Sequence, residues 1–429
     1  MYKNEFKNSL VLRKIGLEKV ITLLVRFVGI GSRFLLTFLL TKEISLEFQG
    51  EYSLVVTSVA LLVILFGFDF YVHSNRMIVK GEYDAVFCLK NSVTFYLLSY
   101  CVLFPAIWFF FKIFSIEFVR VELLLVLILF EHLGQEFFRT YIALGRPLLA
   151  NILLFIRTGL WCLILVLGLL FLKPFQVDLN NILVIWLISA IICAMLGFIF
   201  FPNLKSFFKI KVDKIWIKRG VIVGATMFLS TICLKIIEYS DRYLIVLFTS
   251  KKDLGIYSVF FQLVNVVNVV VFTMYISFLY PSIIKGVYNS NFGAVRAAQK
   301  TIKTKTILAV VFYGIASFFF LPFFLEFIGK EELNQNMFLF YIMLISTLFL
   351  NFSFTSHYVI VGAEKEKMIF TATFIACLVN LAINFSLIPF FGIYGSAFAM
   401  LLSNITLFVI KRKFEKKIIK ISLPNASKK

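Results

Sequence analysis

Fourteen charged side chains lie inside the long apolar stretches of this sequence, apart from Glu51, Glu122 and Glu326 near the stretch ends, and they are the groups there that could do chemistry. Placing a charge at the centre of a bilayer costs on the order of 3 kcal/mol on insertion scales, so each of these side chains needs a partner or a wet cavity. Cations outnumber acids among them. The eight cations are Lys19, Arg26, Arg33, Lys90, Arg139, Arg157, Lys235 and Arg242, and the six acids are Glu18, Asp69, Glu131, Glu136, Glu238 and Asp241.

The spacing of these charges places several of them on shared helical faces. Arg26 and Arg33 are seven residues apart, and Lys235, Glu238 and Arg242 follow an i, i+3, i+7 pattern. One interpretation is internal ion pairing that fixes the helix register, such as Glu238 with Arg242 or with Lys235. The other is a cationic, water-filled cavity between two halves of the protein that accepts an anionic headgroup. Arginine suits phosphate because its planar fork can donate two hydrogen bonds to two oxygens.

The sequence offers little for metal-dependent or covalent chemistry. Its three histidines are His73, His132 and His357, its six cysteines have no close pairs, and it contains no CxxC, HExxH or Walker-type glycine-rich loop. We therefore expect no catalytic residue, no metal site and no cofactor. No predicted outer loop exceeds about ten residues. A membrane polysaccharide polymerase or glycosyltransferase usually needs a larger outer loop for its catalytic residues, so this class is disfavoured.

Membrane-spanning helices must position the charged residues, because the composition fits no other class. Hydrophobic residues make up 61% of the 429 residues, against about 45–50% in soluble globular proteins. The sequence therefore predicts an all-α integral membrane protein, and the net charge of +20 does not indicate a nucleic-acid partner. A crossing takes about 20 apolar residues. About twelve stretches meet that length, namely 15–41, 51–71, 90–111, 121–143, 148–172, 182–202, 220–249, 255–281, 306–328, 335–361, 368–391 and 393–410.

Cations in the loops predict which side of the membrane each loop faces. If the N-terminus is cytoplasmic, 28 loop and tail cations fall on the cytoplasmic side and seven on the other side. This bias predicts an even number of spans and places both termini in the cytoplasm. It also predicts that the basic segment 411–429 is a cytoplasmic tail.

The chain divides into two similar halves. The lysine-rich interval 203–219 lies at mid-chain and separates an N-terminal lobe, 1–210, from a C-terminal lobe, 211–429, with six predicted spans in each. Because six is even, the two repeats are parallel, as in several transport folds that carry their substrate between the lobes. Three short matches recur in the same order, namely Ser32–Leu35 with Asp241–Leu244, Gly50–Ser53 with Gly255–Ser258, and Tyr141–Gly145 with Tyr358–Gly362.

Short motifs at the ends of the predicted spans carry a resemblance to a known family. They are Gly50-x-Tyr52-Ser53, Phe66-Gly67-Phe68-Asp69, Gln135-Glu136-x-x-Arg139 followed by Gly145-Arg146, and Asp241-Arg242-Tyr243-Leu244 leading to Leu254-Gly255-Ile256-Tyr257-Ser258. In the order of these motifs, in length and in span count, the chain resembles Wzx-type flippases of O-antigen or capsule repeat units. Those flippases belong to the superfamily of multidrug, oligosaccharidyl-lipid and polysaccharide exporters.

The resemblance implies a MATE-like fold of two six-helix bundles and a transporter rather than an enzyme. The substrate would be an oligosaccharide repeat unit linked to undecaprenyl pyrophosphate. It would move from the cytoplasmic to the outer leaflet of the bacterial inner membrane by alternating access through a cationic central cavity. The implied partners are this lipid-linked oligosaccharide, membrane lipids and other polysaccharide assembly proteins.

The resemblance also assigns roles to the deep charges. The candidates for binding the pyrophosphate and any acidic sugar are Arg26, Arg33, Arg157, Lys235 and Arg242. The candidates for coupling to an ion gradient, or for ion pairing, are Asp69, Glu131, Glu238 and Asp241. A multidrug exporter of the same fold is the alternative function, and it would favour acidic and aromatic cavity residues over the excess of cations found here.

Overall fold

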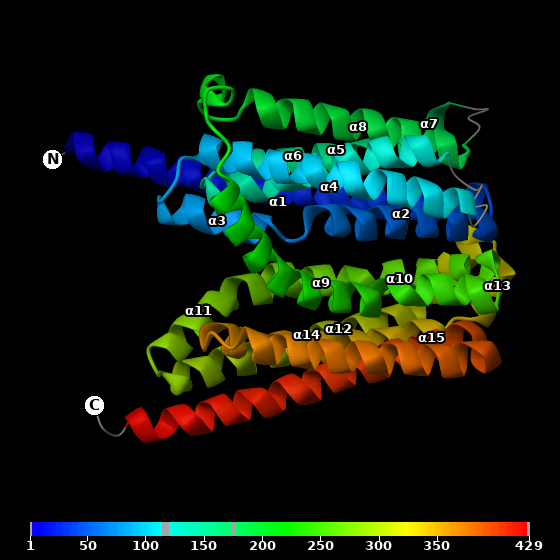
Figure 1. The fold of residues 1–429 in the computed structure, drawn as a ribbon. Helices are drawn as coiled ribbons and strands as arrows, with labels where there is room; N and C mark the ends of the chain where they lie inside the picture. Colours follow the sequence, from blue (N-terminus) through cyan, green and yellow to red (C-terminus); the bar gives the residue numbers. More distant parts are fainter. Residues whose placement is uncertain (1, 114–119, 173–176, 427–429) are drawn as a thin grey trace. The chain divides into compact units, whose positions relative to one another are not determined.

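A computed structural model describes residues 2–113, 120–172 and 177–426, with nearly all of their side chains from residue 21 to residue 421. All regular structure in these ranges is helical (Figure 1). The chain forms two compact units. Unit 1 contains Met1–Leu39 and Val55–Phe228, and unit 2 contains Leu40–Leu54 and Leu229–Lys429. The predicted lobe boundary between residues 210 and 211 lies within unit 1.

Three long helices run from one unit into the other, and the remaining helices each belong to a single unit. The three are α1 (Tyr2–Glu43), α2 (Leu46–Gly67) and α9 (Lys214–Phe248). The others of unit 1 are α3 (Tyr71–Lys80), α4 (Ala85–Ile113), α5 (Val121–Ala143), α6 (Pro147–Phe155), the π-helical turn η1 (Ile156–Leu160), α7 (Trp161–Phe171), α8 (Leu179–Ile199) and the short 3-10 turn η2 (Leu204–Ser206).

Unit 2 is completed by the helices that follow α9. These are α10 (Lys251–Val271), the π-helical turn η3 (Phe272–Ile276), α11 (Ser277–Tyr288), α12 (Phe292–Ile328), α13 (Glu331–Gln335), α14 (Phe338–Gly362) and α15 (Glu366–Ala426). Polar residues start three of the long helices by accepting a hydrogen bond from a backbone N–H of the first turn. They are Asp178 before α8, Ser250 before α10 and Asn291 before α12.

Ten helical stretches of the described chain are long and apolar enough to cross a membrane, which confirms the predicted all-α membrane class. α5 is not among the ten because every 18-residue stretch of it carries at least three charged residues. α15 counts once, although it contains the predicted spans 368–391 and 393–410. Its backbone leaves the helical conformation at Gly392, where φ is 53° and ψ is −133°, and Figure 1 shows one arm on each side of this kink. With α5 and both arms of α15, the helices account for all twelve predicted spans.

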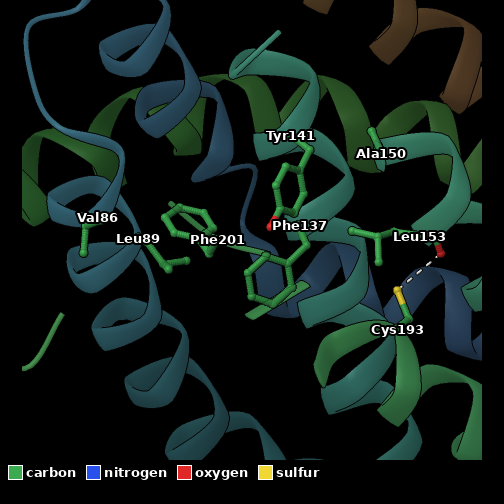
Figure 2. Packing of buried hydrophobic residues seen from close by; sticks show 8 residues of the cluster. All are labelled: Val86, Leu89, Phe137, Tyr141, Ala150, Leu153, Cys193 and Phe201. Atoms are coloured by element: carbon green, nitrogen blue, oxygen red, sulfur yellow. Dashed lines mark hydrogen bonds between the residues drawn. The ribbon is translucent and has the colours of Figure 1, made fainter. Parts of the chain in front are cut away.

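A hydrophobic core of unit 1 joins α4, α5, α6 and α8. Figure 2 shows Phe137 and Tyr141 of α5 between Leu89 of α4 and Leu153 of α6. The Tyr141 hydroxyl donates to the backbone oxygen of Gly197 at 2.9 Å. Fully burying a large apolar side chain contributes about 1.5–3 kcal/mol. This packing therefore holds α5, which carries four charged residues, firmly against its neighbours.

The core of unit 2 joins α9, α14 and both arms of α15. Cys233 and Ile237 of α9 pack against Ala372 and Ala376 of the first arm and Leu407 of the second arm. Small alanine side chains allow helix backbones to approach closely inside a membrane, where packing rather than water drives association. This core fixes the part of α9 that carries Lys235, Glu238, Asp241 and Arg242.

Candidate functional site

Arg26 and Arg33 lie on α1 in unit 1, and neither forms an ion pair with any described residue. Arg26 is half-buried, and its Nε donates to Oδ1 of Asn151 at 2.5 Å. Arg33 is exposed, and its Nε donates to the backbone oxygen of Gly29, one turn earlier, at 3.3 Å. The Ser32 hydroxyl donates to the backbone oxygen of Gly159 at 3.1 Å. α1 is therefore fixed against η1, and no carboxylate among the described side chains neutralises its two cations.

Arg157 and Glu131 form a buried ion pair in unit 1. Nη1 of Arg157, on the π-helical turn η1, is 2.6 Å from Oε2 of Glu131, on α5. The second oxygen of Glu131 accepts from the indole N–H of Trp186, on α8, at 2.6 Å. The Trp186 ring stacks on that of Trp161. For these two candidates the geometry is that of internal ion pairing, and a role of Arg157 in substrate binding stays a prediction.

A second buried cluster of unit 1 centres on Glu136, a residue that the sequence did not single out for a role. Oε2 of Glu136 accepts from the Tyr96 hydroxyl at 2.5 Å, and Oε1 accepts from Nη1 of Arg139 at 2.7 Å. His132, fully buried one turn earlier, lies with Nε2 3.8 Å from Oε1 of Glu136. Its Nδ1 shares a hydrogen bond of 2.5 Å with the Tyr100 hydroxyl. The i, i+4, i+7 spacing of His132, Glu136 and Arg139 is the sequence signal for this cluster.

Asp69 lies in the turn between α2 and α3, and it is buried. Its φ is 50°, a left-handed conformation that aspartate tolerates better than most residues. It lies within electrostatic range of Arg139, whose guanidinium is 3.7 Å from the centroid of the Tyr71 ring. The structure thus brings Asp69 near the Glu136 cluster. Whether it couples to an ion stays a prediction.

In unit 2, Lys235 and Glu238 form a partly exposed ion pair on α9. Nζ of Lys235 is 2.6 Å from Oε2 of Glu238, and their side chains are 27% and 41% exposed. Nζ of Lys235 also lies 4.9 Å from the centroid of the Tyr239 ring. Of the two partners that the spacing allowed for the Glu238 carboxylate, Lys235 is therefore the one that pairs with it. This exposure leaves both charges able to meet a ligand.

Arg242 and Asp241, one turn further along α9, are both buried. Nη1 of Arg242 donates to the backbone oxygen of Glu238 at 2.6 Å and lies 3.6 Å from Oδ1 of Asp241. The guanidinium also lies 4.5 Å from the centroid of the Phe261 ring. Asp241 accepts hydrogen bonds from the Tyr257 hydroxyl and from the backbone N–H of Arg242. These contacts hold the pair in place on the α9 side that faces α10.

The repeated motifs Gly50–Ser53 and Gly255–Ser258 contact each other inside unit 2. A Cβ on Gly50 would lie 2.0 Å from the backbone oxygen of Lys251, and a Cβ on Gly255 would lie 1.8 Å from that of Leu46. The hydroxyls of Ser53 and Ser258 are hydrogen-bonded at 2.8 Å. The two motifs therefore recur in the sequence because the first turns of α2 and α10 cross at a backbone-to-backbone contact that only glycine permits.

The described residues offer an arrangement that can bind and position an anion. Most of the deep acids pair with a cation, whereas Arg26 and Arg33 have no carboxylate partner among the described residues. No three His, Cys, Asp or Glu side chains lie together as a metal ion requires within the described ranges. Two of the predicted residues on α1 and four on α9 are held in separate units, so each set is best considered by itself.

Comparison with known proteins gives one family match and several similar folds. Residues 13–287 match the family described as polysaccharide biosynthesis protein. No curated protein matches the sequence. A multidrug resistance MATE family transporter of the MOP superfamily, in its inward-facing conformation, has a TM-score of 0.73 at 11% identity, over 94% of this chain and 99% of that chain. In its outward-facing conformation such a transporter has a TM-score of 0.64 at 12% identity, over 95% and 97%.

A flippase has the same architecture. The lipid II flippase MurJ, in an inward closed conformation, has a TM-score of 0.68 at 14% identity, over 95% of this chain and 90% of that chain. Identities this low show the fold alone. They confirm the predicted MATE-like fold.

Proposed function

Since the chain belongs to the family of polysaccharide biosynthesis proteins, we propose that it is a flippase for an oligosaccharide linked to undecaprenyl pyrophosphate. It moves the repeat unit from the cytoplasmic to the outer leaflet of the bacterial inner membrane, beside other proteins of polysaccharide assembly. Alternating access suits this task. The lipid tail stays in the bilayer while the polar head crosses a hydrated path, so the sugar never enters hydrocarbon.

The observation that carries this proposal is that Arg26 and Arg33 have no carboxylate partner among the described residues. Both are on a membrane-spanning stretch of α1, and no described carboxylate pairs with either. A cation in that position needs a counter-charge because its burial in hydrocarbon is costly. A pyrophosphate supplies such a charge, and its oxygens match the two-pronged donor geometry of guanidinium. In unit 2, considered by itself, the partly exposed Lys235 is a separate candidate contact for an anion.

The alternative substrate class, a cationic drug, is disfavoured by the state of the acids. Glu131, Glu136, Glu238 and Asp241 each lie within 4.0 Å of an arginine or lysine nitrogen. Binding a cationic drug would first require one of these ion pairs to open. The two unpaired arginines would also repel it.

The test is translocation by the full chain in proteoliposomes. The probe is a fluorescent undecaprenyl-pyrophosphate oligosaccharide, read by the fraction accessible to a membrane-impermeant quencher. Arg33→Gln should lower the rate roughly tenfold, because a charge-assisted hydrogen bond contributes about 1.5–3 kcal/mol. Arg120→Gln is the matched control, since Arg120 is exposed and lies outside the spans. Transport of ethidium without transport of the lipid, or an unchanged rate for Arg33→Gln, would overturn the proposal.

A further inference from the structure

A group of cations in unit 2 has no part in the site described above. Lys303 of α12 and Arg412 of α15 approach the same aromatic ring, that of Phe408. Nζ of Lys303 is 5.9 Å from the ring centroid and Cζ of Arg412 is 5.7 Å from it. The ring is held in turn by Phe352 of α14, at 5.7 Å between centroids. Two cations from different helices therefore lie near the ring of Phe408.

A third cation lies next to this pair, and the nearby acid is already engaged. Lys411 precedes Arg412 on α15 and is only 3% exposed. Glu415, one turn later, is also buried, and its two oxygens accept from Nε2 of Gln299 at 2.8 Å and from the Ser356 hydroxyl at 2.6 Å. Within the described residues, no carboxylate lies within 4.0 Å of Lys303, Lys411 or Arg412.

This arrangement is electrostatically unbalanced. Lys303 lies within electrostatic range of Glu415, which attracts it, and of Arg412, which repels it, so two cations share one nearby acid. Glu415 is anchored by α12 and α14 and forms no ion pair with Lys303 or Arg412. Like charges held close together repel, and they are stabilised when a shared anion binds between them. An arginine fork beside a lysine point charge is a donor set that fits phosphate.

We propose that Lys303 and Arg412, both beside Phe408, form a binding site for the phosphate of a lipid headgroup. The two helices reach this point beyond the apolar part of α15, on the side that the loop cations predict to be cytoplasmic. A lipid headgroup lies at that level of the membrane. The ligand is the diphosphate of the transported lipid, held before translocation. This identification rests on the proposed function, whereas the binding of phosphate does not.

The test measures lipid binding to the purified full chain in detergent, by native mass spectrometry with undecaprenyl pyrophosphate as the probe. The double variant Lys303→Gln/Arg412→Gln should bind it at least about tenfold more weakly, as expected for the loss of two charge-assisted contacts. The matched control is Lys305→Gln/Lys413→Gln, which removes two exposed cations from the same two helices. Its affinity should stay within about twofold of the wild type. Equal losses in both double variants would overturn the site.

Two further arms identify the source of the phosphate. Excess phosphatidylglycerol should not displace undecaprenyl pyrophosphate from the wild type. Displacement at equal concentration would overturn the assignment to the transported lipid and would make the ligand a bilayer phospholipid. Phe408→Leu keeps an apolar side chain of most of the volume but removes the ring, and it should weaken binding while the melting temperature stays near that of the wild type. Translocation by the wild type is measured separately, so a failure of the proposed function is distinguished from a failure of this site.

Discussion

Gly255→Ala should destabilise unit 2 and separate α2 from α10. The new Cβ would lie 1.8 Å from the backbone oxygen of Leu46 and 2.7 Å from its carbon, where ordinary contact begins near 3.4 Å. The obstacle is backbone, so the first turn of α2 must move by about 1.6 Å rather than a side chain rotating away. That shift would break the hydrogen bond between Ser53 and Ser258. Overpacking costs about 1–3 kcal/mol and a neutral hydrogen bond about 0.5–1.5 kcal/mol, so we expect a loss of about 2–4 kcal/mol.

The assay is thermal unfolding of the purified full chain in detergent, followed by the loss of far-UV circular dichroism, because both units are helical. Gly31→Ala is the matched control, because a Cβ at Gly31 meets nothing within 4 Å. Alanine is also the better helix former, so this control should melt at or slightly above the wild-type temperature. Gly50→Ala should behave like Gly255→Ala, since its Cβ would meet the backbone oxygen of Lys251 at 2.0 Å. Equal melting temperatures for Gly255→Ala and Gly31→Ala would refute the reasoning.

Three further predictions concern other parts of the chain. Arg157→Gln leaves Glu131 as an uncompensated buried charge and should cost about 3–5 kcal/mol of stability. The double variant Glu131→Gln/Arg157→Gln should recover part of this loss. The same melting temperature in the single and double variants would contradict the prediction. Burial, with Arg76 and Arg219, lowers the pKa of His73 below its ordinary 6.5, so the unfolded chain takes up the proton first and stability falls as the pH drops below 6.5. His73→Phe should reduce the loss of melting temperature between about pH 7.5 and pH 5.5, and an unchanged loss would exclude this role. The single-cysteine variants Lys209→Cys and Lys420→Cys should be labelled only from the cytoplasmic side, and labelling from outside would reverse the predicted topology.

The number and order of the spans could be predicted from the sequence because each crossing needs an uninterrupted apolar run. The paired glycine motifs were also visible, and their contact explains why they recur. The kink at Gly392 falls between the two predicted spans 368–391 and 393–410, where the backbone leaves the helical conformation. In each case, a local property of the chain reports directly on the fold.

The partners of the deep charges could not be predicted, because they depend on how helices pack. Glu131 and Arg157 are 26 residues apart and meet only because η1 faces α5 across the bundle. The π-helical conformation of η1 itself has no signal in the residues Ile156–Leu160. Spacing did limit the choice for Glu238 to two cations on its own helix, but Arg242 lies beside Asp241 and leaves Lys235 as the ion-pair partner. The bond from Tyr96 to Glu136 was missed because a tyrosine in an apolar run looks like a core residue.

Residues 40–54 belong to unit 2, whereas the residues on both sides of them belong to unit 1. This has a consequence for expressing the chain as two fragments. These residues precede the predicted lobe boundary, yet they pack in unit 2, where Gly50 and Ser53 meet α10. A fragment of residues 211–429 would leave that glycine surface of α10 bare, and a fragment of residues 1–210 would carry the missing piece. Two halves made as separate polypeptides should therefore each be incomplete and should rescue one another when made together, as in fragment complementation.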